Sequence, residues 1–344
     1  MIVKPLNVRA RIKLIVVVVL VLFFCLAPVA RADSLDDLWG FVQCSITTED
    51  IKDDIRLIAH EAMTGRGLGT VGADYMSYFL ARELRRSGWR PLGEKNDSER
   101  TYFQTFRVFS WSHQVEIMGN SRNVLGYVEG EIKDEFIIIG AHYDHLGVIK
   151  GQTYLGADDN GSGVCALLEI AEAYSELARD APMLQKGIKP RRSIIIAFWS
   201  GEEEGLVGSK YFVNHLPPEV SLKKIALVIN LDMVGRNDPK DIYVESPRGD
   251  EKSFTEAYGD LVSLLKEANN YVGLHLRYAT DDEASDHAAF TELRPTYNIP
   301  VLCFWTGYHA DYHKPTDTWD KVNCEKVRDV ARLAFLVSWK AGQK

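Results

Sequence analysis

Acidic and histidine side chains follow four apolar segments of this chain, at the point where each segment ends. His142 and Asp144 come directly after the segment 136–141. The same arrangement recurs three times, with Glu202 and Glu203 after 194–199, Asp232 after 227–231, and His309, Asp311 and His313 after 301–305. Buried carboxylates are costly unless they are paired or bind a cation. If the four segment ends lie together, their side chains need a compensating cation.

A glycine-rich segment, 156–163, carries Asp158 and Asp159 at the expected start of a helix. Either aspartate could serve as the helix N-cap. A phosphate-binding loop is excluded, because acidic side chains occupy the place where an anion would sit. Each motif is weak alone, since the run Glu202-Glu203-Glu204 by itself would be a solvated turn. Their coincidence indicates a metal site.

The apolar segments predict central strands of a sheet, because nearly uninterrupted apolar runs suit strands covered on both faces. We expect strands at 123–128, 135–141, 193–199, 225–232 and 299–304. The expected helices are at 48–62, 72–87, about 161–178, 205–215, 253–270 and 323–340. This alternation predicts an α/β fold with a mostly parallel, mixed sheet sandwiched between helices. In such sheets ligands bind beyond the carboxyl ends of the strands, where these polar residues stand.

The N-terminal segment differs from the rest of the chain of 344 residues. A basic flank precedes an apolar run at 14–30, and Ala30-Arg31-Ala32 resembles a cleavage site. Residues 1–32 are therefore expected to be a signal peptide, with an uncleaved membrane anchor as the alternative. We expect an exported protein, periplasmic or extracellular, that contacts a membrane only if this segment is retained.

The charge of the remaining chain excludes one class of partner. Residues 33–344 hold 35 basic and 48 acidic residues. Because a basic footprint is absent, we expect no nucleic-acid partner.

The cysteines give a weaker constraint. Cys44, Cys165, Cys303 and Cys324 would allow up to two disulfides after export, with three pairings that the sequence does not rank. For Cys165 and Cys303, which stand within apolar runs, buried thiols are favoured. No CxxC pair occurs, so a cysteine-type zinc site is not expected.

The motifs resemble those of a known family, the co-catalytic dizinc aminopeptidases, whose relatives include glutamate carboxypeptidases and glutaminyl cyclases. The resemblance covers about residues 123–340, with the motifs in the family's order. They are AHYDHLG (141–147), GADDNGSG (156–163), GEEEGLVGS (201–209), NLDMVGR (230–236), SDHAAF (285–290) and DYHKPTDT (311–318). The resemblance implies the zinc-dependent exopeptidase fold and the hydrolysis of N-terminal residues from peptides with a free N-terminus.

The resemblance also implies a set of metal ligands. His142 and Asp232 are expected to hold one zinc ion and Glu203 and His313 a second, with Asp158 bridging the two. Imidazoles and carboxylates are ligands that suit zinc.

Further residues near these ligands have implied roles. Glu202 is expected to be the general base that accepts a proton from the attacking water. Asp144 is expected to accept a hydrogen bond from the second ring nitrogen of His142. Tyr312 is either a hydroxyl donor to the oxyanion or a packing aromatic. His145 and His309 are interpreted as loop or rim residues, and the acidic run 281–283 as a solvated loop that could alternatively meet a substrate amine.

Many members of this family carry an inserted protease-associated domain of about a hundred residues. Here only a short β-like stretch separates Trp89 from Asn123. We therefore expect a single catalytic domain at 33–344, in which 33–122 supplies the leading helices and a β segment.

Three alternatives remain at this point. A glutaminyl-cyclase-like acyltransferase is expected to use one zinc ion, and the intact His142 and Asp232 argue against it. A carboxypeptidase-like member stays open, although the sequence does not identify the arginine that would bind a terminal carboxylate. A non-enzymatic ectodomain would have lost a ligand or the base, whereas the five ligands and Glu202 are all present.

Overall fold

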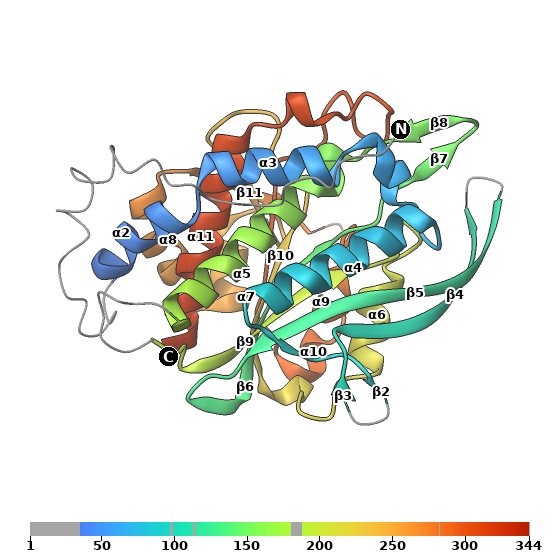
Figure 1. Cartoon of the computed structure of the whole chain (residues 1–344). Coiled ribbons are helices and arrows are strands. Elements are labelled where there is room, and N and C mark those ends of the chain that lie inside the picture. The colour runs from blue at the N-terminus through green and yellow to red at the C-terminus, as the bar shows by residue number, and fades with distance from the viewer. Residues whose placement is uncertain (1–34, 97–98, 113–114, 180–187, 282, 344) are drawn as a thin grey trace, which may run out of the picture.

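A nine-stranded mixed sheet runs through the described part of the chain. The computed structural model describes residues 35–96, 99–112, 115–179, 188–281 and 283–343. The strands of the sheet are β1 (Arg90–Pro91), β4 (Phe103–Ser112), β5 (Val115–Val128), β6 (Ile132–His142), β9 (Arg192–Trp199), β10 (Ile225–Leu231), β11 (Asp241–Ser246), β12 (His275–Thr280) and β13 (Val301–Trp305). Their order is β1-β5-β9-β6-β10-β13-β11-β12, and β4 pairs with β5, with which it forms a long hairpin (Figure 1).

The central strands end at one edge of the sheet. β6 is parallel to β9 and to β10, and β10 is parallel to β13. In register, His142 of β6 stands beside Trp199 of β9, and Leu231 of β10 beside Phe304 of β13. β5 and β11 run antiparallel to their neighbours β9 and β13. The predicted fold class, α/β with a mixed sheet, is confirmed.

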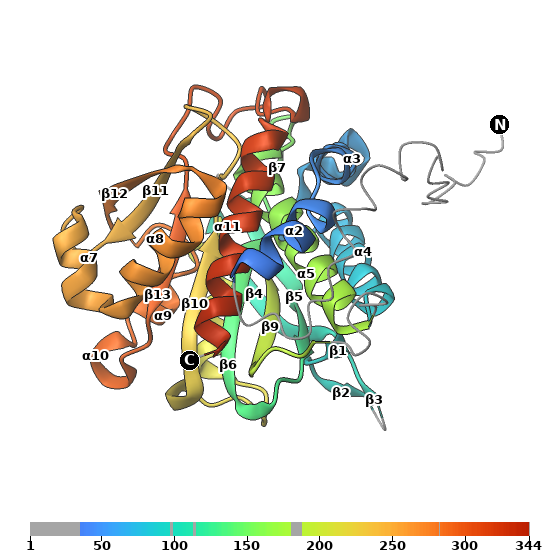
Figure 2. The ribbon, with the colours of Figure 1, turned by 90° about the vertical axis from the view of Figure 1, so that its left-hand side faces the viewer.

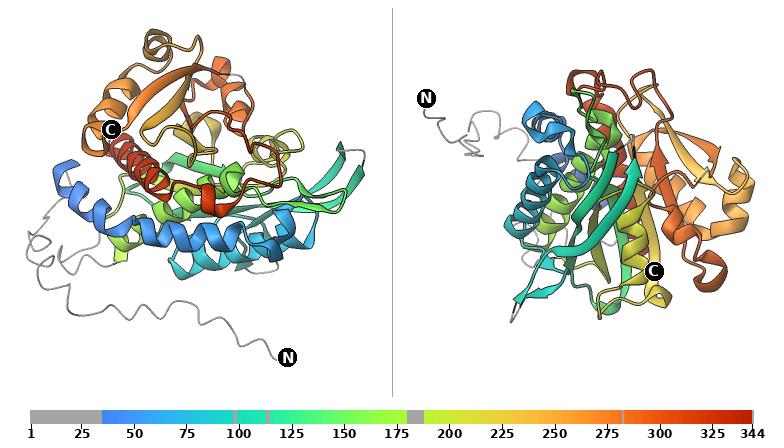
Figure 3. Two further views of the ribbon diagram at one scale, coloured as in Figure 1. Left: turned by 90° about the horizontal axis from the view of Figure 1, so that it is seen from above. Right: turned by 90° about the vertical axis from the view of Figure 1, so that its right-hand side faces the viewer.

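Helices cover both faces of the sheet. They are α2 (Leu35–Ser45), α3 (Thr48–Ile58), α4 (Val71–Arg86), α5 (Gly163–Arg179), α6 (Val207–Asn214), α7 (Glu251–Tyr258), α8 (Asp260–Val272), α9 (Ala288–Thr291), α10 (Arg294–Tyr297) and α11 (Cys324–Gln343). Figure 2 shows α4 and α5 on one side of the sheet and α9 on the other. The view from above in Figure 3 shows the same layering.

Successive side chains of β6 point to opposite faces of the sheet, so this strand contributes to the cores on both faces. Ile137 and Ile139 pack into the larger core beneath α5 and α11, while Ile138 packs into a second core with Phe212 of α6 and Phe290 of α9. All of these side chains are buried. Fully burying a side chain of this size contributes roughly 1.5–3 kcal/mol, so the apolar run that ends in His142 fixes the position of that end firmly.

One expectation about the fold was wrong, and two strands of the sheet were missed. The helix predicted at 253–270 is two helices, α7 and α8, because Gly259 between them adopts φ +53°, which breaks the helical backbone. The strands β11 and β12 were not predicted. They are short and extend the sheet beyond β13, with Glu245 near the end of β11.

The remaining expectations concern the termini and cysteines. The predicted signal peptide or anchor, residues 1–32, lies outside the described residues. Within the described ranges, no helix has the length and apolar character needed to cross a membrane. All four cysteines at 44, 165, 303 and 324 are free thiols, and those of Cys165 and Cys303 are buried as predicted.

Candidate active site

The predicted metal ligands meet at the edge of the sheet where the parallel strands end. His142 is the last residue of β6, Glu203 follows β9, and Asp232 follows β10. His313 lies in the loop after β13, and the turn 157–162 before α5 adds an aspartate. Parallel strands bring their carboxyl ends to one edge, so residues far apart in the sequence become neighbours.

The side chains in this group face one another across short distances. Nε2 of His142 lies 3.4 Å from Oδ1 of Asp232, and Nε2 of His313 lies 3.1 Å from Oε2 of Glu203. Asp159 stands between the two pairs. Its Oδ1 is 3.5 Å from Nε2 of His142, and its Oδ2 is 3.2 Å from Nε2 of His313. Asp159 therefore presents one oxygen to each histidine.

These separations fit ligands that share a cation. Two atoms at about 2.0–2.1 Å from a tetrahedral zinc ion are about 3.3 Å apart, close to the four distances above. Nε2 of His142, Oδ2 of Asp159 and Oδ1 of Asp232 are buried and make no hydrogen bond within the described residues. Buried polar atoms without a partner are rare in proteins. The donor set, two imidazoles and three carboxylates, also suits zinc.

The predicted bridging residue, Asp158, does not face the two histidines. Its Oδ1 accepts a hydrogen bond from the backbone N–H of Gly235 at 2.7 Å, and its Oδ2 lies 3.4 Å from Nε2 of His309. The backbone at Asp159 is not helical, with φ −101° and ψ 98°, so the two adjacent side chains point in different directions. The predicted bridging residue is therefore wrong by one position: Asp159, and not Asp158, lies between the two histidines.

Asp144 contacts the second ring nitrogen of His142, as predicted, but through its backbone carbonyl oxygen and not through its carboxylate. Its backbone carbonyl oxygen is 3.2 Å from Nδ1 of His142, whereas its carboxylate Oδ1 is 3.8 Å away. Oδ1 instead accepts from the backbone N–H of Glu202 at 3.3 Å. Burial raises the pKa of Asp144 to about 6. Asp144 thus orients the imidazole ring through its carbonyl and the Glu202 backbone through its carboxylate.

Glu202 lies farther from His142 than Asp159 and Asp232 do. Its Oε2 is 3.8 Å from Nε2 of His142, and its side chain is 12% exposed. Burial raises the pKa of Glu202 well above its usual range; the charge of His142 opposes this and that of Glu203 adds to it. A carboxylate with a raised pKa is suited to take up a proton and release it again.

The ring of Tyr312 packs against the rings of two neighbouring residues, His313 and Tyr308. Its ring stacks on that of His313, with centroids 3.9 Å apart and planes inclined by 22°, and it contacts Tyr308 at 4.7 Å. Burial raises the pKa of its hydroxyl, which therefore stays protonated. These contacts hold the imidazole ring of His313 in place, and the role of the hydroxyl as an oxyanion donor stays a prediction.

Sequence reasoning missed several supporting residues. His145 is not a rim residue: it is 1% exposed, and its Nδ1 lies 2.7 Å from Oε1 of Glu203. Oδ2 of Asp317 accepts from the backbone N–H groups of Asp158 and Asp159 at 2.9 and 3.1 Å. Both residues stand inside motifs that had been recognised, AHYDHLG and DYHKPTDT, but spacing alone does not show which way their side chains point.

Arg66 supports the same loops from the side of the leading helices. Its side chain is fully buried. The guanidinium donates to the carbonyl oxygens of Tyr143 at 2.8 Å, Ile58 at 3.0 Å, Leu155 at 2.7 Å and Gly156 at 2.8 Å. Two of these carbonyls lie just after His142 and just before the turn that carries Asp159. The arginine therefore ties helix α3 to both metal-site loops.

A cavity opens onto this group of side chains. Its polar lining comes from Asp159, Glu202, Asp232, Glu245, Ser285 and His313, and its remaining lining from Met233, Ala284, Cys303, Trp305, Tyr308 and Tyr312. Acidic groups therefore dominate the charge of its wall, and aromatic rings form part of its apolar surface.

Comparison with known proteins gives two curated relatives. Leupeptin-inactivating enzyme 1 of Streptomyces exfoliatus is 32% identical over 193 residues, which are 56% of this chain and 37% of that protein. Aminopeptidase YwaD of Bacillus subtilis (strain 168) is 29% identical over 234 residues, 65% of this chain and 45% of that protein. The chain thus spans less than half the length of these two relatives.

A solved structure shows the same fold. BSAP, a zinc aminopeptidase from Bacillus subtilis, superposes with a TM-score of 0.64 at 16% identity, covering 86% of this chain and 95% of that one. The model of peptidase family M28 matches residues 123–338, from β5 to the last turns of α11. That match spans more than half of the sequence and includes every strand end described above, and so the chain belongs to peptidase family M28.

Proposed function

We propose that this protein is a dizinc exopeptidase that removes N-terminal residues from peptides. The observation that carries the proposal is the position of Asp159, which directs one carboxylate oxygen to His142 and the other to His313. His142, Asp159 and Asp232 would hold one zinc ion. Asp159, Glu203 and His313 would hold the second.

The residues of the chain supply the proton transfers. Zinc, when bound, lowers the pKa of a coordinated water and polarises the carbonyl of the scissile bond. Glu202 accepts the proton of the attacking water and returns it to the leaving amine. The raised pKa of Glu202 supports this role, because the base must hold the proton until the amine leaves. The hydroxyl group of Tyr312 donates a hydrogen bond to the developing oxyanion.

The charge of the cavity favours an amine over a carboxylate. Among the described residues that line it, His313 is the sole basic side chain, and none is lysine or arginine. The nearby Arg236 is already paired with Asp311 at 2.6 Å and Asp317 at 3.4 Å. Asp159 and Asp232 are proposed zinc ligands, so Glu202 and Glu245 are the acidic side chains of the wall that would attract the ammonium group of a free N-terminus. The described lining holds no lysine or arginine that would bind a terminal carboxylate. This supports an aminopeptidase over the carboxypeptidase-like alternative.

Export is part of the same proposal. The basic flank and the apolar run within residues 1–32 support secretion to the periplasm or the exterior. Contact with a membrane then depends on whether this segment is retained. Sequencing the N-terminus of the exported protein tests the cleavage: a start near Asp33 supports it, and a start at Met1 contradicts it.

The activity is tested by metal analysis together with a substrate panel. We expect two zinc ions per chain and hydrolysis of leucine 4-nitroanilide, with no hydrolysis of its N-acetylated form. Removal of C-terminal residues from N-blocked peptides would overturn the proposal in favour of a carboxypeptidase. One zinc ion per chain with cyclisation of N-terminal glutamine would overturn it in favour of an acyltransferase.

A further inference from the structure

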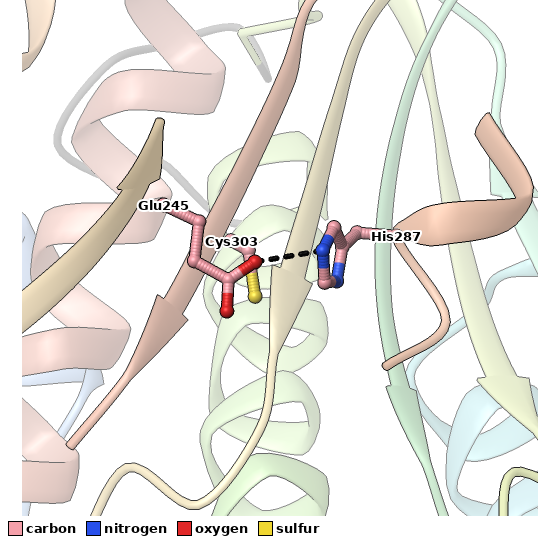
Figure 4. A group of neighbouring side chains, drawn as sticks. All are labelled: Glu245, His287 and Cys303. Carbon is pink, nitrogen blue, oxygen red and sulfur yellow. Dashed lines mark ion pairs between the residues drawn. The ribbon is translucent and has the colours of Figure 1, made fainter. Parts of the chain in front are cut away.

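A second group of histidine and acidic side chains lies next to the candidate metal centre. Figure 4 shows Glu245 from β11 and His287, just before α9, facing each other beside Cys303 of β13. Nε2 of His287 is 2.7 Å from Oε2 of Glu245 and 2.9 Å from Oδ1 of Asp281. Asp281 is thus an ion-pair partner with a side chain only 13% exposed, whereas Glu283 of the same acidic run is exposed, as expected of a solvated loop. Asp282 of the same acidic run lies outside the described residues.

The distances in this group are those of hydrogen bonds. Glu245, His287 and Cys303 have donor atoms close enough together to be considered as metal ligands. Ligands of one zinc ion would stand about 3.3 Å apart, whereas 2.7 and 2.9 Å are ordinary separations between hydrogen-bonded atoms. Nε2 of His287 is hydrogen-bonded to Oδ1 of Asp281 and forms an ion pair with Oε2 of Glu245, at a separation too short for two ligands of one zinc ion.

The group holds more acidic than basic side chains. Nε2 of His287 has at most one hydrogen, and two carboxylates approach it. Even a fully protonated imidazole neutralises one carboxylate of the two. The pKa of His287 is raised well above its usual range, because Asp281, Glu245 and Cys303 outweigh the opposing effect of burial. Carboxyl groups therefore outnumber the basic group in this part of the wall.

Glu245 and Cys303 line the same cavity as Glu202 and Asp232. A short chain of hydrogen bonds connects the two groups: Asn230 Nδ2 donates to Ser285 Oγ at 2.9 Å, and Ser285 Oγ donates to Asp232 at 2.6 Å. Asn230 Nδ2 is also 3.8 Å from the thiol of Cys303. Glu245 therefore lines the cavity beside the proposed ligand sets and is not part of them.

The wall beside these carboxyl groups is aromatic. Trp305 and Tyr308 contact each other with ring centroids 5.3 Å apart, and Tyr243 packs behind Trp305 at 5.8 Å. Aromatic faces pack well against methylene chains and attract cations. A long aliphatic stem that ends in a positive charge matches both parts of the wall.

We propose that Glu245, positioned by His287, is a specificity-determining residue that makes the enzyme favour substrates whose first residue is lysine or arginine. This inference rests on the proposed aminopeptidase function, because the cavity takes the first residue of a peptide only if Glu202 acts on the bond that follows it.

The test compares two substrates that differ in one charge. Lysine and norleucine 4-nitroanilides share a four-carbon stem, and only lysine ends in an ammonium group. For the zinc-loaded enzyme we expect kcat/KM for lysine to exceed that for norleucine by roughly tenfold or more, the effect of one charged hydrogen bond. Glu245→Gln should lower this ratio by about the same factor. Glu251→Gln, which removes an exposed carboxylate six positions along the chain, should leave the ratio unchanged.

A binding measurement separates the two proposals. Calorimetric titration with free L-lysine and L-norleucine reports on the pocket even if no substrate is turned over. Tighter binding of lysine that is lost in Glu245→Gln supports the inference, whatever the activity. Equal binding and equal turnover of the two amino acids, or a lysine preference that persists in Glu245→Gln, overturns it and leaves the aminopeptidase proposal standing. Failure to hydrolyse any aminoacyl substrate contradicts the aminopeptidase proposal instead.

Discussion

Two neighbouring groups of histidines and carboxylates differ in how their atoms are spaced. Around Asp159, the nitrogen–oxygen separations are 3.1–3.5 Å. Around His287, the separations are 2.7 and 2.9 Å. The residue types are the same, but in the first group the side chains point at a common centre and in the second they point at one another.

The difference teaches that donor identity alone does not define a metal site. In the pair of Glu245 and His287 the charged atoms contact each other directly, at a distance too short for two ligands of one zinc ion. The group around Asp159 leaves buried charge that only a cation compensates. The expected effects of substitution therefore diverge: changes in the first group should alter metal content, and changes in the second should not.

The largest effect is expected at Asp159. Asp159→Ala removes an oxygen from both proposed ligand sets, so it should lose both zinc ions and reduce kcat/KM by more than about 10⁴-fold. Asp158→Ala is the matched variant one position away. Its side chain does not face the histidines, so it should retain zinc measured by mass spectrometry. Retention of two zinc ions by Asp159→Ala would falsify the bridging role.

Glu202→Gln should separate chemistry from metal binding. The amide cannot accept a proton, so kcat should fall by about 10²–10⁴-fold, which is the typical contribution of a general base. Zinc content should remain at the wild-type level, because Glu202 lies outside the proposed ligand sets. Loss of zinc together with activity would instead make Glu202 a ligand.

A smaller effect is expected at His145. Its Nδ1 holds Oε1 of Glu203 at 2.7 Å, so His145→Gln should loosen Glu203 and lower zinc affinity by about 10–100-fold. Competition with a chelator measures this change. His60→Gln, which changes an exposed histidine that is not among the proposed ligands, is the control and should leave the affinity unaltered.

The contrasting variant is His287→Gln. Because the second group holds no proposed ligand, zinc content should not change. Loss of the ion pair with Glu245 and Asp281 should lower the free energy of unfolding by about 1–3 kcal/mol, measured by chemical denaturation. The lysine-to-norleucine ratio should fall as well, which a purely structural role would not produce. An unchanged ratio would leave Glu245 without a positioning partner.

The smallest effect concerns Glu169 of α5, a buried carboxylate in neither group. Burial raises the pKa of Glu169 well above 4.5, and Asp54 and Asp50 add to the shift. The unfolded chain ionises this group from about pH 4.5 upwards and the folded chain only at higher pH, so the free energy of unfolding should fall as pH rises through that window. Glu169→Gln should remove this loss and be more stable than wild type at pH 8, by about 1–2 kcal/mol.

The pH dependence is the measurement that decides this prediction. Denaturation of Glu169→Gln and wild type at pH 4.5 and pH 8 should show a difference that grows with pH. Glu176→Gln, on the same helix but partly exposed, should show no such trend. A constant difference at both values would mean that Glu169 is ionised in the folded protein.

The sequence predicted the parts of the site that stand at the ends of buried strands. His142 and Asp232 follow apolar runs whose direction and burial are set by the core, so their place at one edge of the sheet could be inferred. Parallel packing of β6 and β10 then makes them neighbours. These positions follow from the hydrophobic pattern alone.

Residues on turns and edge strands could not be placed in the same way. Asp158 and Asp159 are adjacent and identical in type, and only the backbone of the turn decides which one faces the histidines. Gly156, at φ +57°, sets the start of that turn, and a side chain there would lie 2.1 Å from the carbonyl oxygen of Asp159. Glu245 was missed because β11, a short strand outside the main apolar runs, was itself not predicted.

The guanidinium of Arg66 connects the leading helices to the candidate active site by hydrogen bonds. It lies outside the family-matched segment 123–338, yet four backbone carbonyls from helix α3 and two catalytic loops converge on it. Without this guanidinium, the four carbonyl oxygens would be buried with no hydrogen-bond donor. Moving the loops away from the leading helices therefore costs free energy. The candidate active site is therefore expected to unfold together with the leading helices. A fragment confined to residues 123–338 would keep the proposed ligands but would lack the arginine that holds their loops in place.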